Sequence, residues 1–242
     1  MLEVNNVSKH LGRAEGFDLR NISFKLKDGE KLLMLGKNGS GKSTCLKLIC
    51  NVIVPDSGCV LYNGKDICKA PRKFFRSLGL FQGGKSTLDA TLSMRHNFQF
   101  TSYMYGMKKK TANEQIEKFC EGFKTLPKLL DKYYNEMSLG EKTICELINS
   151  CLHKPEYVFL DEPTTGIDIE NKNIIARFIQ TLEKEHLTNC IITTHDLAFA
   201  QMLHFEKTCV LDSGMLCYFD TDSEKGISLL KDLSENEISE GE

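Results

Sequence analysis

The chain has 242 residues, of which 41% are hydrophobic and 26% charged, and its net charge is −2. This is the composition of an ordinary globular protein, and the length allows a sizeable core in one large domain or two small ones. The net charge excludes a strongly basic protein that attracts nucleic acid through the electrostatic field of its whole surface. No apolar run approaches the ~18–20 residues that span a bilayer, and the N-terminus lacks a basic segment followed by an apolar one, so we expect a reduced, cytosolic chain whose membrane role comes through a partner.

Short apolar runs bounded by turn residues predict strands in the first third of the chain. The predicted strands cover residues 2–7, 19–26, 31–35 and 59–62. Asn63-Gly64 is expected to close a hairpin after the last of them, because this dipeptide tolerates the positive φ that tight hairpin turns require. Apolar residues at helical spacing predict a helix over 44–50.

Between the third predicted strand and this helix lies a complete G-x-x-x-x-G-K-[ST] sequence. Its residues are Gly36, Lys37, Asn38, Gly39, Ser40, Gly41, Lys42 and Ser43. Such a loop curls so that successive N–H groups point inward, and the helix that follows favours an anion at its N-terminus. Lys42 is expected to reach the β- and γ-phosphates, and Ser43 to offer a hydroxyl to Mg²⁺. An ordinary glycine-rich turn is the alternative, but the strand and helix context favours nucleoside triphosphate binding.

The remaining pattern alternates strands and helices. Strands are predicted over 78–81, 157–160, 190–193, 207–211 and 215–219, and helices over most of 91–152 and over 171–187. This order favours an α/β fold in which a helical insertion separates two parts of one nucleotide-binding core. Residues 234–242 are rich in glutamate, and we expect them to form a frayed, solvated tail.

The cysteines and the basic run 108–110 carry little functional signal. The ten cysteines include no C-x-x-C pair, which disfavours a zinc or thioredoxin-like site, and several lie in apolar runs where cysteine acts as a small hydrophobe. The three consecutive lysines at 108–110 are the only dense basic cluster in the sequence, and such runs usually lie on a solvated face.

A second cluster follows the predicted strand 157–160. The strand ends in Asp161 and Glu162, so a buried strand would carry Asp161 to the sheet edge, where it can order the Mg²⁺ held by Ser43. Glu162 faces differently and could polarise an attacking water. An apolar run ending in two acids is also a common strand end, and a plain surface carboxylate is the alternative for Glu162. The complete phosphate loop upstream favours an Mg²⁺-binding role for Asp161 and a catalytic role for Glu162.

Four further segments make the chain resemble the ATP-binding domain of ABC transporters. They are Gln82 after a strand, Ser138-Leu139-Gly140-Glu141 in the helical part, Glu162-Pro163-Thr164-Thr165-Gly166-Ile167-Asp168, and Thr193-Thr194-His195-Asp196. They occur in the family's order at family-like spacings. The resemblance implies one ABC ATP-binding domain over residues 1–222, with a P-loop NTPase (RecA-like) core, an antiparallel β subdomain, a helical subdomain at about 88–152, and an acidic tail over 223–242.

The resemblance also implies a mechanism and residue roles. Two nucleotide domains, either copies of this chain or this chain and a paralogue, close head to tail around ATP and Mg²⁺. Lys42, Ser43 and Thr44 match the residues that hold the phosphates and Mg²⁺. Gln82 matches the glutamine that contacts Mg²⁺ or the attacking water and couples to the membrane subunit. Glu162 matches the catalytic base, His195 the γ-phosphate contact, and Asp168 an aspartate that reaches across the dimer.

Two positions depart from the family pattern. Ser138 and Gly140 keep a hydroxyl and a close backbone approach for the opposite γ-phosphate, but Leu139 replaces a glycine, and a side chain there is costly if the backbone needs φ > 0 or close packing. Leu11, with His10 beside it, stands where an aromatic residue usually stacks on adenine. Adenine would then pack on an aliphatic side chain or on imidazole.

The leading functional hypothesis is the ATPase subunit of an exporter with a separate integral membrane permease, held on the inner face of the cell membrane by that permease. The segment 88–106 is similar to exporters with ABC-2 membrane subunits. A non-transport ABC ATPase acting on DNA or ribosomes is the main alternative, although a single phosphate loop and the missing heptad run disfavour it, and we expect no nucleic acid partner. A weakly hydrolysing half of a heterodimer is the third possibility.

Overall fold

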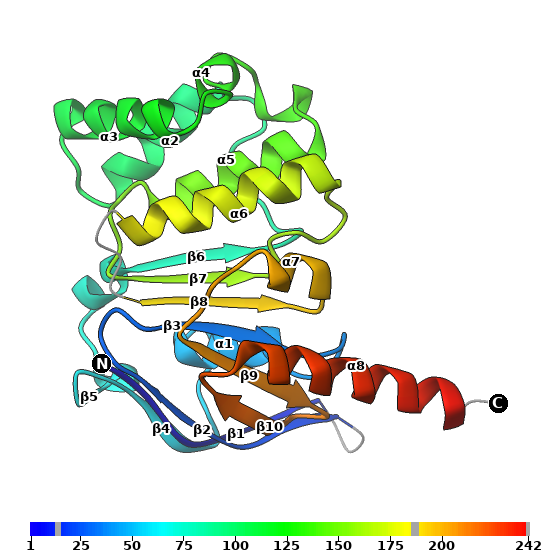
Figure 1. Cartoon of the computed structure of the whole chain (residues 1–242). Coiled ribbons are helices and arrows are strands. Elements are labelled where there is room, and N and C mark those ends of the chain that lie inside the picture. Colours follow the sequence, from blue (N-terminus) through cyan, green and yellow to red (C-terminus); the bar gives the residue numbers. More distant parts are fainter. Residues whose placement is uncertain (13–15, 185–188, 241–242) are drawn as a thin grey trace. The chain divides into compact units, whose positions relative to one another are not determined.

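The computed structural model describes residues 1–12, 16–184 and 189–240, and for 181–184 and 234–240 it describes the backbone alone. The chain divides into two compact units. Unit 1 comprises Met1–Arg72 and Thr188–Glu242, and unit 2 comprises Lys73–Leu187. Both contain strands and helices, in agreement with the predicted α/β class (Figure 1).

One sheet of unit 1 is antiparallel, with strand order β2-β1-β4-β5. Its strands are β1 (Leu2–Leu11), β2 (Phe17–Leu26), β4 (Ser57–Tyr62) and β5 (Lys65–Asp66). Val4 pairs with Phe24 and Val7 with Ile22, and all four side chains are buried. The β4–β5 hairpin closes at Asn63 and Gly64, both with positive φ, which confirms the predicted turn.

The other strands of unit 1 follow the order β10-β9-β3-β8. They are β3 (Lys31–Leu35), β8 (Asn189–Thr194), β9 (Lys207–Asp212) and β10 (Met215–Asp220). β3 runs parallel to both β8 and β9, and their central side chains are buried apolar groups, as parallel strands covered on both faces require. The helices of this unit are α1 (Lys42–Ile49), α7 (Leu197–Gln201) and α8 (Ser223–Glu240), with a 3₁₀ turn at Ile67–Lys69.

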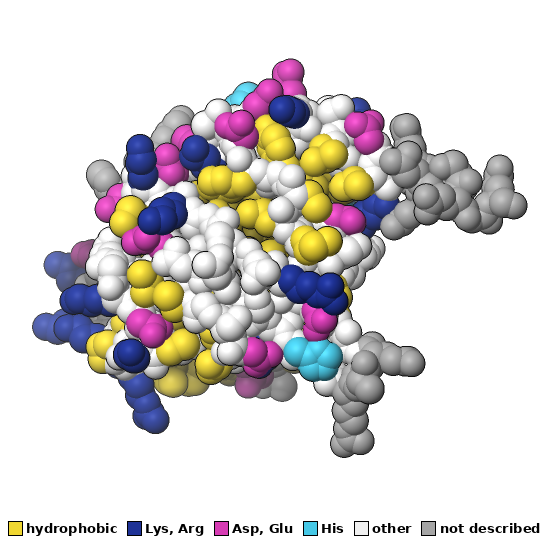
Figure 2. Space-filling view, turned by 90° about the horizontal axis from the view of Figure 1, so that it is seen from below, with side chains coloured by type: hydrophobic (Ala, Val, Ile, Leu, Met, Phe, Trp, Pro, Cys, Tyr) yellow, Lys and Arg dark blue, Asp and Glu magenta, His cyan; other side chains and the backbone are white. Residues whose placement is uncertain are grey.

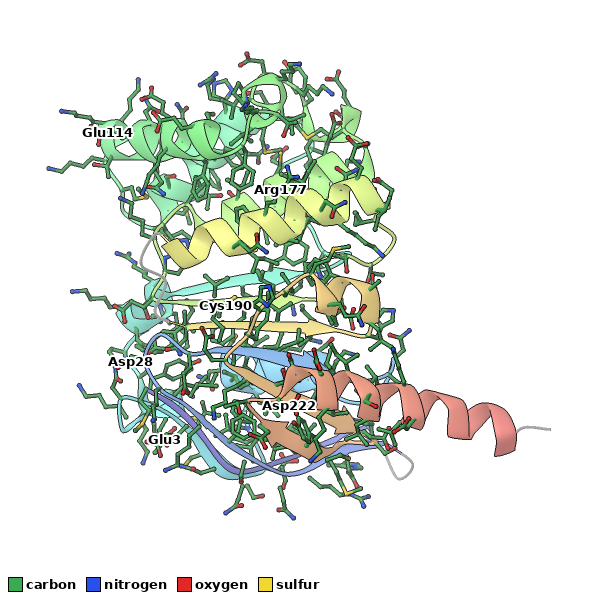
Figure 3. The ribbon with its side chains drawn as sticks, viewed as in Figure 1. Glu3, Asp28, Glu114, Arg177, Cys190 and Asp222 are labelled. Carbon is green, nitrogen blue, oxygen red and sulfur yellow. The ribbon has the colours of Figure 1, made fainter. Side chains whose placement is uncertain are left out.

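The predicted frayed tail is wrong for most of its length, because α8 continues through Glu240. The Asp222 carboxylate accepts a hydrogen bond from the Lys225 N–H over 3.0 Å and so caps the start of the helix (Figure 3). Ile227 and Leu230 are buried, and α8 packs against β9, β10 and β3 (Figure 1). Tertiary packing of this short apolar stripe fixes the helix, and glutamates are good enough helix formers to extend it.

Unit 2 contains the parallel strands β6 (Leu78–Gln82) and β7 (Tyr157–Asp161) and a set of helices. The helices are α2 (Met94–Met104), α3 (Lys109–Gly122), α4 (Leu126–Leu129), α5 (Leu139–Cys151) and α6 (Ile169–Lys184), with 3₁₀ turns at Arg72–Ser77 and Tyr134–Glu136. α5 and α6 lie side by side over β6 and β7, and α2 to α4 lie beyond them (Figure 1). Helices α2 to α5 therefore fall in the predicted helical segment.

The helical part of unit 2 has an aromatic core. Phe119 and Phe123 contact Phe178 of α6 with ring centroids 6.2 and 5.2 Å away. All three rings are buried. Offset and tilted aromatic contacts of this kind add to the free energy gained by burying the rings. The last residues of the predicted helix 171–187, from 185 onward, lie outside the described residues.

Six of the ten cysteines are buried, including Cys190 at the start of β8 (Figure 3). Burial raises the pKa of the Cys45, Cys145 and Cys151 thiols to about 12. These side chains act as small hydrophobes, as the sequence predicted. None of the described helices is both long enough and apolar enough to cross a bilayer.

Candidate nucleotide site

The phosphate loop lies between β3 and α1, as predicted, and its glycines are needed for its shape. Gly39 and Gly41 have φ values of 80° and 105°, in the region that favours glycine. A Cβ atom at Gly41 would lie 2.8 Å from Leu19 Cδ1 and 2.9 Å from Phe17 Cζ, so these two side chains would have to shift to admit it. The Ser40 N–H donates to the Lys37 carbonyl oxygen over 3.2 Å and tightens the curl.

Lys42 lies inside this curl. Its ammonium donates to the carbonyl oxygens of Gly36 and Lys37 over 2.7 and 2.9 Å, and the residue is buried. Ser43 and Thr44 follow in the first turn of α1, which contains no acidic residue. The buried Ser40 Oγ has no hydrogen-bond partner among the described residues. A buried cation, an unsatisfied hydroxyl and a helix N-terminus fit the triphosphate of a nucleotide.

His195 follows β8 at the sheet edge where the phosphate loop begins. Leu35, the last residue of β3, pairs with Thr194, the last residue of β8. Gly36 and His195 are therefore the next residues on neighbouring parallel strands, and His195 is exposed. Asp196 caps α7 by accepting the Phe199 N–H over 3.0 Å. Ligands of α/β proteins bind at this kind of edge, outside the carboxyl ends of parallel strands.

Leu11, the predicted adenine contact, has an aromatic neighbour. Leu11 is half-buried at the end of β1 and pairs with Phe17 of β2. The Phe17 ring and the Leu19 side chain both approach the phosphate loop at Gly41. His10 Nδ1 lies 2.5 Å from Asp18 Oδ1, and this hydrogen bond raises the pKa of His10. No local pattern in the sequence points to Phe17, because only the pairing of β1 with β2 brings it beside Leu11.

In unit 2, Gln82 and Asp161 are brought together at the ends of β6 and β7. They are register partners, and the Gly83 N–H donates to the Asp161 carbonyl oxygen over 2.9 Å. Asp161 is buried. A Cβ atom at Gly83 would lie 2.9 Å from the Glu162 carbonyl oxygen, so glycine allows this close approach.

Glu162 has φ 50°, a left-handed conformation that is unusual for a residue other than glycine. Such backbone strain costs about 1–3 kcal/mol and is concentrated at functional sites. The Thr165 hydroxyl donates to the Glu162 carboxylate over 3.5 Å. The backbone therefore turns away from the direction of β7 at Glu162, immediately after Asp161. This agrees with the prediction that the two carboxylates face in different directions.

Ser138 and Asp168 lie at the starts of α5 and α6. Ser138 is the N-cap of α5, and its Oγ accepts the Glu141 N–H over 3.3 Å. Asp168 precedes α6, and its carboxylate accepts the Asn171 N–H over 3.0 Å and the Asn171 side-chain amide over 2.7 Å. These bonds lower the pKa of Asp168. Both side chains fix helix starts.

Asn171 contacts residues at both helix starts, and no local sequence pattern points to it. A Cβ atom at Gly140 would lie 2.3 Å from Asn171 Nδ2. Gly140 therefore permits a close approach, but to a side chain of its own unit. Leu139 begins α5 outside the set of positive-φ residues, so the φ > 0 condition under which a side chain there would be costly is not met at this described position, and its side chain is exposed.

The described residues contain no group of three or more His, Cys, Asp or Glu side chains placed to hold a metal ion by themselves. Mg²⁺ in nucleotide sites takes one or two protein oxygens and completes its octahedron with phosphates and waters. The Ser43 hydroxyl of unit 1 and the Asp161 carboxylate of unit 2 are each a donor of the kind that such sites use.

Comparison with known proteins places the chain in a family. The family model described as ABC transporter matches residues 19–165. NatA, an ABC transporter ATP-binding protein of Bacillus subtilis, is 28% identical over 83% of this chain and 80% of NatA. The linearmycin resistance ATP-binding protein LnrL of B. subtilis is 30% identical over 93% of this chain and 70% of LnrL. YbhF of Escherichia coli, a probable multidrug ABC transporter ATP-binding protein, is 32% identical over 81% of this chain and 33% of YbhF.

Solved structures support the same fold. A dimeric bacterial ABC transporter cassette, MJ0796, matches with a TM-score of 0.80 over 91% of this chain and 98% of that cassette, at 21% identity. An ATP-binding subunit of an ABC transporter matches with a TM-score of 0.79 over 93% of this chain and 91% of that subunit, at 22% identity. The chain belongs to the ABC transporter family and is an ATP-binding ATPase subunit of it.

Proposed function

We propose that this chain powers an exporter that has a separate integral membrane permease, by hydrolysing ATP held between two nucleotide-binding domains arranged head to tail. The observation that carries the proposal is the gathering of the candidate residues at strand ends in each unit. Unit 1 gathers the phosphate loop and His195, and unit 2 gathers Gln82, Asp161 and Glu162. Similarity to LnrL and to the doxorubicin resistance protein DrrA of Mycobacterium tuberculosis favours export.

The proposed roles follow the chemistry of phosphoryl transfer. Lys42, Ser43 and Thr44 hold the phosphates, and Ser43, Gln82 and Asp161 hold Mg²⁺ and its waters. Mg²⁺ would neutralise charge on the β- and γ-phosphate oxygens. Glu162 orients and polarises the attacking water, and His195 contacts the γ-phosphate. Ser138, Gly140 and Asp168 act on the nucleotide of the opposing domain.

The proposed permease contact is a cleft in unit 2 beside Gln82. Its volume is about 250 Å³, and its lining includes Lys85, Phe100, Met104 and Tyr105. Phe100 and Met104 are 58% and 65% exposed, which is unusual for side chains of this size and marks an interaction surface. We assign this cleft to a segment of the permease on the cytoplasmic side of the membrane, so that movement at Gln82 passes to it.

Action on DNA or ribosomes, the alternative, has less support. On the face shown in Figure 2, basic side chains gather at the left edge, and elsewhere on its coloured part they are interspersed with acidic and hydrophobic ones. The chain as a whole has a net charge of −2, whereas domains that bind the phosphate backbone are usually strongly basic. Import also has a supporting relative, because the molybdate/tungstate import protein WtpC of Methanocaldococcus jannaschii is 31% identical over 92% of this chain. The identity of the permease would decide between import and export.

The test is to purify tagged Glu162→Gln chain with Mg-ATP from detergent-solubilised native membranes and to identify its partners. Slow hydrolysis should trap the closed state and keep the permease attached. Glu162→Gln/Lys42→Ala is the matched control, because it loses ATP binding as well and should retain less of a second nucleotide-binding subunit. Recovery of a polytopic membrane protein supports the proposal. Recovery of ribosomes or DNA-bound proteins without a membrane subunit overturns it.

A further inference from the structure

Lys132 and Glu141 form an ion pair at the start of α5. Lys132 Nζ lies 2.8 Å from Glu141 Oε1, and the other carboxylate oxygen, Oε2, accepts the Ser138 N–H over 3.0 Å. The two side chains are 42% and 29% exposed. The carboxylate is therefore held at both oxygens, one by the helix cap and the other by a lysine nine residues earlier in the chain.

The charge of Glu141 matters because of where it lies. It is the acidic residue of the first turn of α5, where the helix dipole is positive. A carboxylate there offsets the positive end of the helix and repels a second anion, such as a phosphate, that approaches the same N-terminus. The positive charge of the Lys132 ammonium offsets the negative charge of the Glu141 carboxylate. With the pair intact, the start of α5 has no net side-chain charge from these two residues.

Ordinary surface ion pairs contribute little to stability, and their partners are flexible. This pair differs, because Glu141 is fixed by the reciprocal Ser138 cap. The backbone also holds Lys132, whose N–H donates to the Leu129 carbonyl oxygen over 3.1 Å and whose own carbonyl accepts the Met94 N–H over 3.0 Å. The lysine is therefore anchored in the chain before its side chain reaches Glu141.

We propose that Lys132 is a positioning residue that neutralises Glu141, so that the N-terminus of α5 can accept the γ-phosphate of ATP bound by the opposing nucleotide-binding domain. The inference rests on the proposed function, which places Ser138 and Gly140 against that phosphate. Lys132 itself acts through Glu141 and does not touch the nucleotide. Removing the lysine leaves the negative charge of the Glu141 carboxylate uncompensated opposite the triphosphate. Removing both charges leaves no such repulsion.

The experiment measures KM and kcat for ATP in the complex purified through the tagged chain. The variants are Lys132→Ala, Glu141→Gln and the double variant, with Lys128→Ala of α4 as a control that removes a nearby exposed lysine. We expect Lys132→Ala to raise KM by about three- to tenfold, through a partly screened charge repulsion, with kcat changed less. Glu141→Gln in the same chain should restore KM, because the amide keeps the acceptor for Ser138 and lacks the charge. Lys128→Ala should match the unmodified chain.

The dependence of KM on salt concentration distinguishes an electrostatic role of Lys132 from a purely structural one. The Lys132→Ala defect should shrink as ionic strength rises from about 0.05 M to about 0.5 M, because the Debye length shortens. A KM unchanged by Lys132→Ala, or a double variant as impaired as Lys132→Ala alone, overturns the inference. Neither result affects the proposed function, which fails separately if Glu162→Gln leaves hydrolysis unchanged.

Discussion

Gln82 and Asp161 are register partners on the parallel strands β6 and β7, and the Gly83 N–H donates to the Asp161 carbonyl oxygen at the point where both strands end. An amide and a carboxylate are thereby delivered to one edge of unit 2. Asp161→Asn should lower kcat on the order of a hundredfold, because it removes the proposed anionic Mg²⁺ ligand and keeps the shape of the side chain. Gln82→Ala should lower kcat less, about tenfold.

ATPase measurements at saturating Mg-ATP check both values, and thermal unfolding serves as the control for folding. Asp161→Asn should unfold within a few degrees of the unmodified chain, because the substitution is isosteric. Full ATPase activity in Asp161→Asn would contradict the assignment of this carboxylate to Mg²⁺.

Phe17 is expected to contribute more to nucleotide affinity than Leu11. The Phe17 ring is the aromatic group that approaches Gly41 of the phosphate loop, and stacking of a base on an aromatic ring is worth about 1–3 kcal/mol. Phe17→Ala should therefore weaken ATP binding by about tenfold, whereas Phe17→Tyr should keep it. Titration calorimetry with Leu11→Ala as the matched variant tests this. A larger loss of affinity in Leu11→Ala would instead support Leu11 as the adenine contact, as the sequence predicts.

Gly140 and Asn171 should be coupled in stability. In a helix, alanine is normally more favourable than glycine by up to about 1 kcal/mol. At Gly140, however, the new Cβ would displace the Asn171 amide, which is hydrogen-bonded to Asp168. Gly140→Ala should therefore destabilise the unmodified chain by about 1–2 kcal/mol and be neutral or stabilising in an Asn171→Ala chain. Urea unfolding of the four chains gives the coupling, and equal losses in both backgrounds would contradict the contact.

His153 should make stability sensitive to mild acid. Its ring stacks on Tyr105 with centroids 3.7 Å apart, and its Nε2 lies 3.0 Å from the Leu78 carbonyl oxygen. Burial lowers its pKa from 6.5 to about 4, although the Leu78 hydrogen bond opposes this shift. The unfolded chain then takes up a proton below pH 6.5 that the folded chain refuses until about pH 4, so stability is full above 6.5 and falls as pH falls through this window.

The contribution of His153 should amount to a loss of about 2 kcal/mol between pH 7 and pH 5. His153→Gln removes the titrating group and should lack this part of the loss. Urea unfolding at several pH values compares the two chains. If both lose the same stability over this range, the imidazole is not the group responsible.

The parts of the fold that sequence predicted best are those fixed by local pattern. The strand Lys31–Leu35, the phosphate loop after it and the Asn63-Gly64 hairpin all follow from residues adjacent in the chain. Long-range pairing decided the rest. Phe17 reaches the phosphate loop through the register of β1 with β2, and Asn171 meets Gly140 through the packing of α5 on α6. Helix α8 was not predicted, because the glutamate-rich end of this segment dominates its composition and the buried apolar residues Ile227 and Leu230 are few.

The central claim, that this chain hydrolyses ATP with Glu162 as the residue that activates water, is tested most directly by one rate. The rate is Mg-ATP hydrolysis by the complex carrying Glu162→Gln, measured beside the unmodified complex, with bound ATP quantified in both. We predict a fall in kcat on the order of a hundredfold or more with ATP binding retained. Hydrolysis at the unmodified rate would contradict the account.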